Sequence, residues 1–473
     1  MSTAAATGDW QPGFLDRALR PFTEVHTAEG LKAALLSLNI FLILTAYYVL
    51  KPVREALILG QGSAEEKSYL AAAQVVLLAF VVPLYGRMVA RLPRRRLINT
   101  VNVFFVGCLV LFYVLSRFDV PLAVVFFLWI GIFNVMIVAQ FWAFANDVYT
   151  EEQGKRLFAL VGIGASMGAV LGAGVVRGMA EEMTAAQMFG LSATLLTVCA
   201  VLTQVVHVRE TRRDTQERRP EAATSPPPGR ATSGRPQETK KGEGAFQMVW
   251  KYRYLTYLAA FSVIFTLVNT NGQYMLNESV SQWVAAEADD HGPFESEEAQ
   301  EDFRGQKGRA FFGGFFFYQN LLAALLQMFL VSRLVRYAGF GPTFFVLPVI
   351  ALMGAAAVAL VPVIAVVRVA KIAENATDYS INNTSRHMLW LPTTTEMKYQ
   401  AKQAVDTFFV RMGDVGSAVT VAVLAGALGL GIRSFAVTNV VLVVAWLFLA
   451  RAILKERKAL QEKNVPDDPT AAR

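Results

Sequence analysis

The stretch that decides the fold is residues 341–361, GPTFFVLPVIALMGAAAVALV, which contains no acidic or basic side chain. A bilayer-spanning helix needs about 20 predominantly apolar residues, because lipid offers no hydrogen-bond partner to an exposed backbone. This stretch therefore predicts a membrane-spanning helix. Of all 473 residues, 54% are hydrophobic and 17% are charged, against about 25% charged in a typical soluble domain. These values exclude an ordinary soluble enzyme, a secreted disulfide scaffold and a disordered protein.

Eleven other segments of the chain have a similar length and apolar character. The twelve predicted spans are residues 33–57, 69–91, 97–116, 119–145, 157–180, 186–207, 252–277, 308–332, 341–361, 363–389, 403–430 and 433–454. The sequence therefore predicts an all-α polytopic membrane protein with twelve transmembrane helices in two halves of six. The predicted parts are a cytoplasmic N-terminal segment (1–32), a first bundle (33–207), a linker (208–250), a second bundle (251–454) and a tail (455–473).

Two polar stretches predict how the chain is oriented. Residues 208–250 contain three consecutive prolines and a series of basic residues, a composition that does not fold and that favours the cytoplasm. Residues 278–307 carry nine acidic residues, and we expect this loop to lie outside. Both termini are then cytoplasmic. The predicted location is a multi-pass protein of the cell (inner) membrane.

The two halves carry matching landmarks. Gln74, which basic residues follow, corresponds to Gln319 in the second half at an offset near 246. Trp142 corresponds to Trp390 at an offset of 248. Two parallel repeats of six spans around a basic linker are the plan of major-facilitator transporters, whose substrate site lies near mid-membrane. The pattern therefore indicates a secondary transporter.

Charged residues within the spans are the first candidates for binding, because each costs roughly 3 kcal/mol or more in lipid unless it faces water or a partner. Lys51, Arg54 and Glu55 stand near the outer part of the first span. Lys51 and Glu55 are one helical turn apart, so a pair between them would leave Arg54 available to an anion. The alternative is that these side chains reach the membrane interface.

The tenth span carries a stripe of polar residues at helical spacing. The stripe consists of Arg368, Lys371, Asn375, Asp378, Asn382 and Ser385. With Glu374, Arg386 and His387 nearby, it offers cations for an anionic ligand and carboxylates that hold those cations when the site is empty. The alternative is a helix that internal ion pairs hold in place.

The eleventh span adds Arg411, Asp406 and Asp414. Together with His387, the two aspartates are candidates for coupling transport to a proton. Span seven carries Asn269, Asn271, Gln273 and Asn277, whose amides either bind a base or sugar or hydrogen-bond neighbouring helices. We expect no metal site and no cofactor, and no catalytic triad can be assembled, because the four histidines are far apart. The chain is therefore not expected to be an enzyme.

Three stretches resemble the ATP/ADP translocase family, the nucleotide exchangers of plastids and intracellular bacteria. Residues 50–55, LKPVRE, are similar in charge to the family's Leu-Arg-Asp-Thr-Lys-Asp motif. Residues 141–146, FWAFAN, with Lys155-Arg156 after them, resemble its fourth-span motif, which brings Asn146 into the predicted site. The third stretch keeps the family's spacing through Tyr379-Ser380, Arg386-His387-Met388, Leu391-Pro392, Glu396-Met397-Lys398, Lys402-Gln403-Ala404-Val405-Asp406 and Arg411-Met412-Gly413-Asp414-Val415-Gly416.

Two departures from the family pattern concern the substrate. Asp414 stands where the family has a lysine, and His387 stands where it has a glutamate beside the cation. An acid in place of a lysine replaces attraction for phosphate by repulsion. The resemblance implies a nucleotide transporter, whereas the residues allow some other organic anion. Candidates for contact with the anion are Lys51, Arg54, Glu55, Asn146, Arg368, Lys371, Asp378, Asn382, Arg386 and Arg411.

The sequence leaves two other functions open. One is proton-coupled transport of an unrelated solute. The other is a non-transporting membrane scaffold or receptor, in which internal ion pairs would fill the stripe of the tenth span. The expected partners are a small anionic solute, such as a nucleotide or another phosphorylated metabolite, and the lipid bilayer. Nucleic acid is not expected, because no basic stretch is interleaved with aromatic residues. A monomer is one of the oligomeric states left open.

Overall fold

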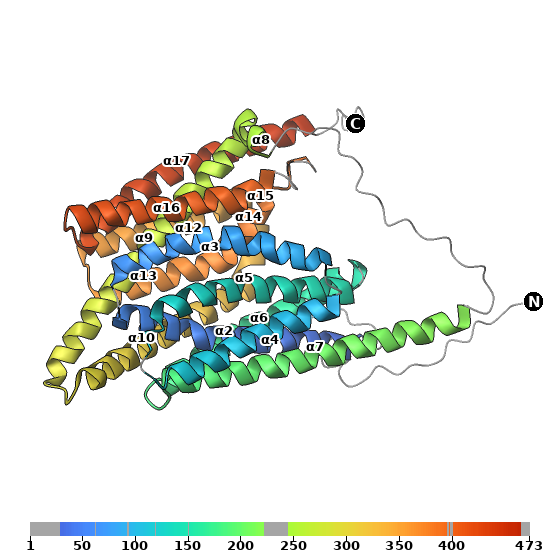
Figure 1. Cartoon of the computed structure of the whole chain (residues 1–473). Helices are drawn as coiled ribbons and strands as arrows, with labels where there is room; N and C mark the ends of the chain where they lie inside the picture. The colour runs from blue at the N-terminus through green and yellow to red at the C-terminus, as the bar shows by residue number, and fades with distance from the viewer. Residues whose placement is uncertain are drawn as a thin grey trace, which may run out of the picture. The chain divides into compact units, whose positions relative to one another are not determined.

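The computed structural model describes residues 29–61, 63–91, 94–118, 120–149, 151–221, 245–394, 397 and 401–464 (Figure 1). Every regular element among these residues is a helix, as the sequence predicts. The first part contains α2 (Gly30–Gln61), α3 (Ala64–Arg91), α4 (Arg94–Leu115), α5 (Ala123–Val148), α6 (Glu151–Met179) and α7 (Ala185–Glu221). The second contains α8 (Ala245–Lys251), α9 (Arg253–His291), α10 (Glu297–Leu325), η1 (Leu326–Leu330), α11 (Val331–Tyr337), α12 (Phe340–Leu360), α13 (Ile364–Thr377), η2 (Asp378–Asn382), α14 (Asn383–Leu389), α15 (Lys402–Ala404), η4 (Val405–Phe409), α16 (Val410–Val421), η5 (Ala422–Ala427) and α17 (Ile432–Asn464).

Ten of the helices in the described part are long and apolar enough to cross a membrane. They correspond to ten of the twelve predicted spans. The remaining predicted spans, 69–91 and 363–389, are also helical. Within 363–389 the charges of the polar stripe interrupt the apolar run, and several side chains of α3 lie outside the described residues. The chain is a multi-pass membrane protein, and the number of twelve crossings stays a prediction.

Several helices extend into ranges that the sequence assigns to loops. α7 continues to Glu221 and α8 begins at Ala245, so both enter the predicted linker 208–250, of which residues 222–244 lie outside the described residues. α9 and α10 likewise occupy most of the acidic range 278–307. The hydroxyl of Ser296 caps α10 by accepting a hydrogen bond from the backbone N–H of Ala299 at 3.1 Å. Polar residues continue these helices because a helix satisfies its own backbone beyond the apolar segment as well.

The contacts divide the chain into two compact units. The first comprises residues 1–54 and 83–231, and the second comprises residues 55–82 and 232–473. In the first unit, six aromatic rings pack against one another within α4, α5 and α7. They are Phe105, Phe112, Phe126, Trp129, Phe133 and Phe189, with neighbouring ring centroids between 4.9 and 6.0 Å apart.

Three glycines let α6 approach α2 closely within the first unit. A Cβ atom at Gly164, Gly168 or Gly172 would overlap backbone atoms of α2. The close approach also allows hydrogen bonds between the helices, from Ser37 Oγ to the carbonyl of Leu160 at 3.0 Å and from Thr45 Oγ1 to the carbonyl of Gly168 at 3.3 Å. Gly164, Gly168 and Gly172 are therefore helix-packing residues, whose lack of a side chain permits this close approach.

The second unit has an apolar core and a separate polar interior. Phe261, Phe265, Phe344 and Trp446 lie in the core, which α9, α12 and α17 share. Gly413 of α16 approaches α9, where a Cβ atom would overlap Thr266 and the carbonyl of Val263. The π-helical turns η1, η2, η4 and η5 belong to this unit. Such turns occur frequently at functional sites, and η2 and η4 each contain a predicted site residue, Asp378 and Asp406.

Candidate functional site

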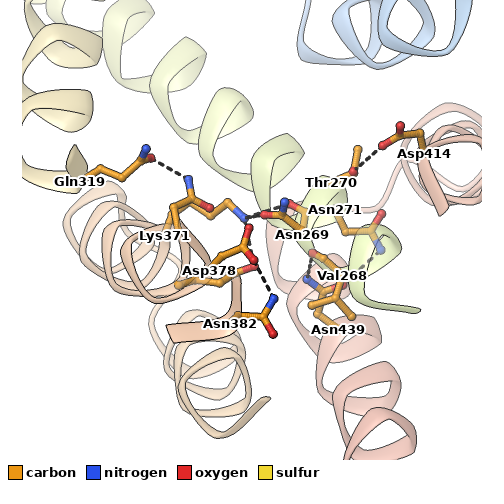
Figure 2. A network of polar contacts seen from close by, with 12 residues as sticks. Val268, Asn269, Thr270, Asn271, Gln319, Lys371, Asp378, Asn382, Asp414 and Asn439 are labelled. Carbon is orange, nitrogen blue, oxygen red and sulfur yellow. Dashed lines mark hydrogen bonds and ion pairs between the residues drawn. The ribbon is translucent and has the colours of Figure 1, made fainter. Parts of the chain in front are cut away.

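Lys371 of α13 is the centre of the polar interior of the second unit (Figure 2). Its side chain is only 3% exposed, and its Nζ lies 3.1 Å from Oε1 of Glu374. The same ammonium donates hydrogen bonds to the backbone carbonyl of Asn269 at 2.9 Å and to its side-chain Oδ1 at 2.5 Å. A charge in such a place costs free energy unless it is paired and hydrogen-bonded, and both conditions are met.

Further polar contacts continue along the same helix. Asn375 donates from Nδ2 to Oε1 of Gln319 in α10 at 2.8 Å, and Asn382 donates from Nδ2 to Oδ1 of Asp378 at 2.8 Å. Lys371, Asn375, Asn382 and Ser385 are buried, as expected for a stripe that faces away from lipid. The sequence predicts one continuous helix here, whereas the structure contains the π-helical turn η2, which shifts the register between Asp378 and Asn382.

A second charged cluster joins α14 to α15 and η4. Arg386 Nη2 lies 3.4 Å from Oδ1 of Asp406, and Lys402 Nζ lies 2.6 Å from Oδ2 of the same carboxylate. Arg386 also stands over the ring of Phe265, 5.5 Å from its centroid. The predicted coupling residue His387 follows Arg386 and is exposed. Two cations thus share one carboxylate, so this cluster carries an excess positive charge.

The remaining predicted residues of the second unit occupy separate positions. Arg411 Nη1 lies 2.9 Å from Oδ2 of Asp414, which also accepts a hydrogen bond from Thr270 Oγ1 at 3.1 Å. Arg368 stands over the ring of Phe311, 4.9 Å from its centroid. Asp414 therefore pairs with a cation three residues earlier on its own helix, which offsets its repulsion of an anion.

Glu55 forms a buried ion pair with Lys67 of α3, a partner that the sequence pattern does not indicate. Lys67 also stands over the ring of Phe312, 5.9 Å from its centroid. The glutamate and the lysine are 12 positions apart on different helices. No helical spacing marks such a pair, which is why the sequence gives no signal for it.

In the first unit, the predicted cations lie against aromatic rings. Lys51 stands over Tyr48 at 5.2 Å, and Arg54 stands over Phe127 at 5.1 Å. Tyr47 packs edge-on against Tyr48, with ring centroids 5.2 Å apart. Aromatic faces stabilise a desolvated cation, which permits these residues to remain inside a membrane helix. Asn146 lies in α5, and its side chain is outside the described residues.

The amides of α9 mostly connect helices. Asn271 donates from Nδ2 to Oδ1 of Asn439 at 3.1 Å and accepts from Ser417 Oγ at 2.7 Å. Asn439 in turn donates to the backbone carbonyl of Val268 at 3.1 Å. Asn269 differs, since it holds Lys371, a role that the sequence did not assign to it. Asn271 and Asn439 therefore serve as links between α9, α16 and α17.

The free space beside Lys371 within this unit is small. A cavity of about 20 Å³ is lined by Gly272, Lys371 and Glu374 together with apolar residues. A single water needs roughly 10–15 Å³. The cavity beside Lys371 and Glu374 is thus large enough for one water molecule, and the residues around it are close-packed.

Comparison with known proteins agrees with this architecture. The family model described as Major Facilitator Superfamily matches residues 36–377, and the model described as TLC ATP/ADP transporter matches residues 314–457. ADP,ATP carrier protein 1 of Chlamydia pneumoniae is 22% identical over 70% of this chain and 68% of its own length. ADP,ATP carrier protein 5 of Rickettsia felis is 22% identical over 85% of this chain and 88% of its own.

Solved structures show the same fold at low identity. The nucleoside transporter NupG has a TM-score of 0.56 at 11% identity, covering 89% of this chain and 98% of its own. A bacterial homolog of the human lysosomal transporter Spinster has a TM-score of 0.53 at 13% identity, covering 90% of this chain and 97% of its own. The chain therefore belongs to the Major Facilitator Superfamily, and its C-terminal region matches the ATP/ADP transporter model.

Proposed function

We propose that the protein moves an anionic, phosphorylated metabolite, with a nucleotide as the first candidate, across the membrane by alternating access. The observation that supports this proposal most is the buried ammonium of Lys371, whose charge is held by Glu374 and Asn269 inside the predicted span 363–389. A buried ion pair that only stabilised the fold would be replaceable as a whole by apolar residues of similar volume at little cost. Lys371 is therefore proposed to bind the anion.

Other cations are proposed to contribute to the same task. Arg386 combines partial exposure, at 29%, with a planar guanidinium that forks onto phosphate oxygens. Lys51 and Arg54 stand beside the rings of Tyr48 and Phe127, an environment suited to an anion that carries a flat base. The names of the similar ADP,ATP carriers make adenine nucleotides the first substrates to test.

The direct test uses purified protein in liposomes. Vesicles preloaded with unlabelled ATP or ADP should take up labelled nucleotide faster than empty vesicles. Arg386→Ala should slow this uptake at least about tenfold, since loss of a charged contact is worth about 1.5–3 kcal/mol. If internal nucleotide gives no acceleration while an imposed pH gradient drives another solute, the nucleotide proposal is wrong.

Proton-coupled transport remains a second candidate because of Asp378. This carboxylate lies inside the span and accepts a hydrogen bond from the amide of Asn382, with no cation within ion-pair distance among the described residues. A carboxylate in such surroundings is a candidate for carrying a proton. Dependence of uptake on an inward proton gradient in the wild type, lost in Asp378→Asn, would favour this candidate.

The scaffold alternative makes its own prediction about the ion pairs. Lys371 with Glu374, and Arg386 with Asp406, are arranged as internal pairs, which a non-transporting protein would also require. In that case, Arg386→Ala would change the melting temperature without changing any flux. Measuring stability and flux on the same preparation separates the two functions.

A further inference from the structure

The ammonium of Lys371 has no free hydrogen-bond donor. A lysine ammonium carries three N–H groups. Among the described residues it has three acceptors, which are the carbonyl oxygen and Oδ1 of Asn269 and Oε1 of Glu374. An anion can therefore bind Lys371 only by taking the place of one of these acceptors.

Glu374 is the acceptor that an anion would replace. The two oxygens of Asn269 are neutral and belong to α9, whereas Glu374 carries the negative charge that an incoming phosphate or carboxylate would supply. Glu374 lies three residues from Lys371 on the same helix, and its side chain is 15% exposed. Because both residues belong to the same helix, a change in the Glu374 side-chain torsions separates its carboxylate from the ammonium.

The other charged residues near Lys371 do not pair with its ammonium, because each has a different contact. Asp378 is held by the amide of Asn382, and Asp406 is shared by Arg386 and Lys402. Arg368 stands over the ring of Phe311. Within the described part of this unit, Glu374 is thus the one carboxylate within ion-pair distance of Lys371.

We propose that Glu374 is an internal counter-anion, which occupies Lys371 when cargo is absent and so allows the empty carrier to change its orientation. This inference rests on the proposed transport of an anion. A carrier whose buried cation is neutralised only by cargo must return loaded, and it performs strict exchange. A carrier with its own counter-anion can return empty, and it also performs net transport.

The empty carrier needs a counter-anion because an unpaired buried charge raises the free energy of its closed state. Without Glu374, the empty carrier would have to pass through its closed state with the Lys371 charge uncompensated, which is strongly unfavourable in a low-dielectric interior. The loaded carrier would pass through the same state with the charge neutralised by the anion. Removal of Glu374 should therefore block the return of the empty carrier and leave exchange intact.

The test compares two fluxes from liposomes loaded with labelled ADP. Efflux into medium with saturating ADP measures exchange, and efflux into ADP-free medium measures net transport, with valinomycin and potassium clamping the membrane potential. Glu374→Gln should keep exchange within a few-fold of wild type and lower net efflux by at least about 100-fold, the effect expected for one uncompensated buried charge. The control is Glu278→Gln on α9, because Glu278 accepts from Gln282 Nε2 at 2.8 Å and is not an acceptor of Lys371.

A second variant guards against misfolding. Glu374→Asp keeps the charge but shortens the side chain by one methylene, so it weakens the pair without leaving Lys371 uncompensated. Its ratio of net efflux to exchange should lie between those of the wild type and Glu374→Gln. The inference is overturned if neither variant lowers the ratio, or if wild-type protein exchanges ADP but shows no efflux into ADP-free medium. Absence of exchange in the wild type with ADP, ATP or phosphate would instead overturn the proposed function, and the inference with it.

Discussion

In the first unit, aromatic rings fill the interior within α4, α5 and α7, whereas in the second unit a lysine, a glutamate and several amides occupy the interior around α13. Both units nevertheless use glycine for a close helix approach, at Gly168 of α6 against α2 and at Gly413 of α16 against α9. The two units thus pack their helices in a similar way, while the side chains that fill their interiors differ. The comparison teaches that close helix packing is compatible with an aromatic interior in one unit and with a polar interior in the other.

The π-helical turns follow the same division. η2 and η4 interrupt the helices that carry Asp378 and Asp406, while α4, α5, α6 and α7 of the first unit run without such a turn in their described residues. A π-helical turn inserts one residue into the helix and changes the direction of the side chains beyond it. In the second unit, this places polar groups at positions that regular spacing would not give them.

The largest effect is expected where a buried charge loses its partner. Lys371→Gln leaves the carboxylate of Glu374 buried and unpaired, which should lower the free energy of unfolding by about 3–5 kcal/mol. Anion flux should disappear at the same time. Denaturant unfolding in detergent and uptake into liposomes check the two effects.

A double variant shows whether the loss of stability comes from the unpaired charge or from the changed side-chain shape. Lys371→Gln with Glu374→Gln removes both charges, so it should regain most of the lost stability and still show no flux. A double variant as unstable as Lys371→Gln alone would mean that the interior of the second unit depends on something other than this pair. The stability of the polar interior would then depend on packing, as that of the apolar interior of the first unit does, and not on the charge pair.

A smaller effect is expected from one methyl group on α6. A Cβ atom at Gly168 would overlap the backbone of Phe41, so Gly168→Ala should lower the free energy of unfolding by about 1–3 kcal/mol. Gly162 on the same helix has open space around it, and Gly162→Ala should instead stabilise the helix by up to about 1 kcal/mol. Thermal unfolding of the two variants checks the difference, and equal melting temperatures would contradict close packing of α6 on α2.

The smallest effect is expected from two matched asparagines that connect helices. Asn39 donates from Nδ2 to Thr203 Oγ1 at 2.9 Å and to the carbonyl of Cys199 at 3.0 Å in the first unit, and Asn271 contacts Asn439 and Ser417 in the second. Interhelical hydrogen bonds in membranes average about 0.6 kcal/mol and reach about 1.7. Asn39→Ala and Asn271→Ala should therefore each lower the unfolding free energy by about 1 kcal/mol and leave flux nearly unchanged. Loss of flux in Asn271→Ala alone would assign that amide to the bound solute.

Much of the fold follows from the sequence because apolar length is a local property. A stretch such as residues 341–361 specifies a spanning helix by itself, and α12 covers Phe340–Leu360. The glycines of α6 are similarly readable, since their spacing of four places them on one face of a helix. The ends of α7, α9 and α10 were not predicted, because the polar residues there are compatible with either helix or loop.

The candidate site was predicted only in part, since its contacts depend on helix pairing. The polar stripe of α13 and η2 is visible in the spacing of Lys371, Asn375 and Asn382, and Glu374 is visible three residues after Lys371. The contact of Asn269 with Lys371 and the pair of Glu55 with Lys67 join different helices, and no spacing rule reports them. The register change at η2 is likewise invisible, because its sequence, Asp378–Asn382, suits an ordinary helix as well.

The most direct test of the central claim, that the buried cation of α13 binds an anionic cargo, is nucleotide counterflow in liposomes. Labelled ADP should accumulate transiently in vesicles preloaded with unlabelled ADP when they carry the wild-type protein. It should not accumulate when they carry the stable double variant Lys371→Gln with Glu374→Gln. Equal counterflow in the two preparations would contradict the claim, because transport would then proceed without the charge that is proposed to hold the anion.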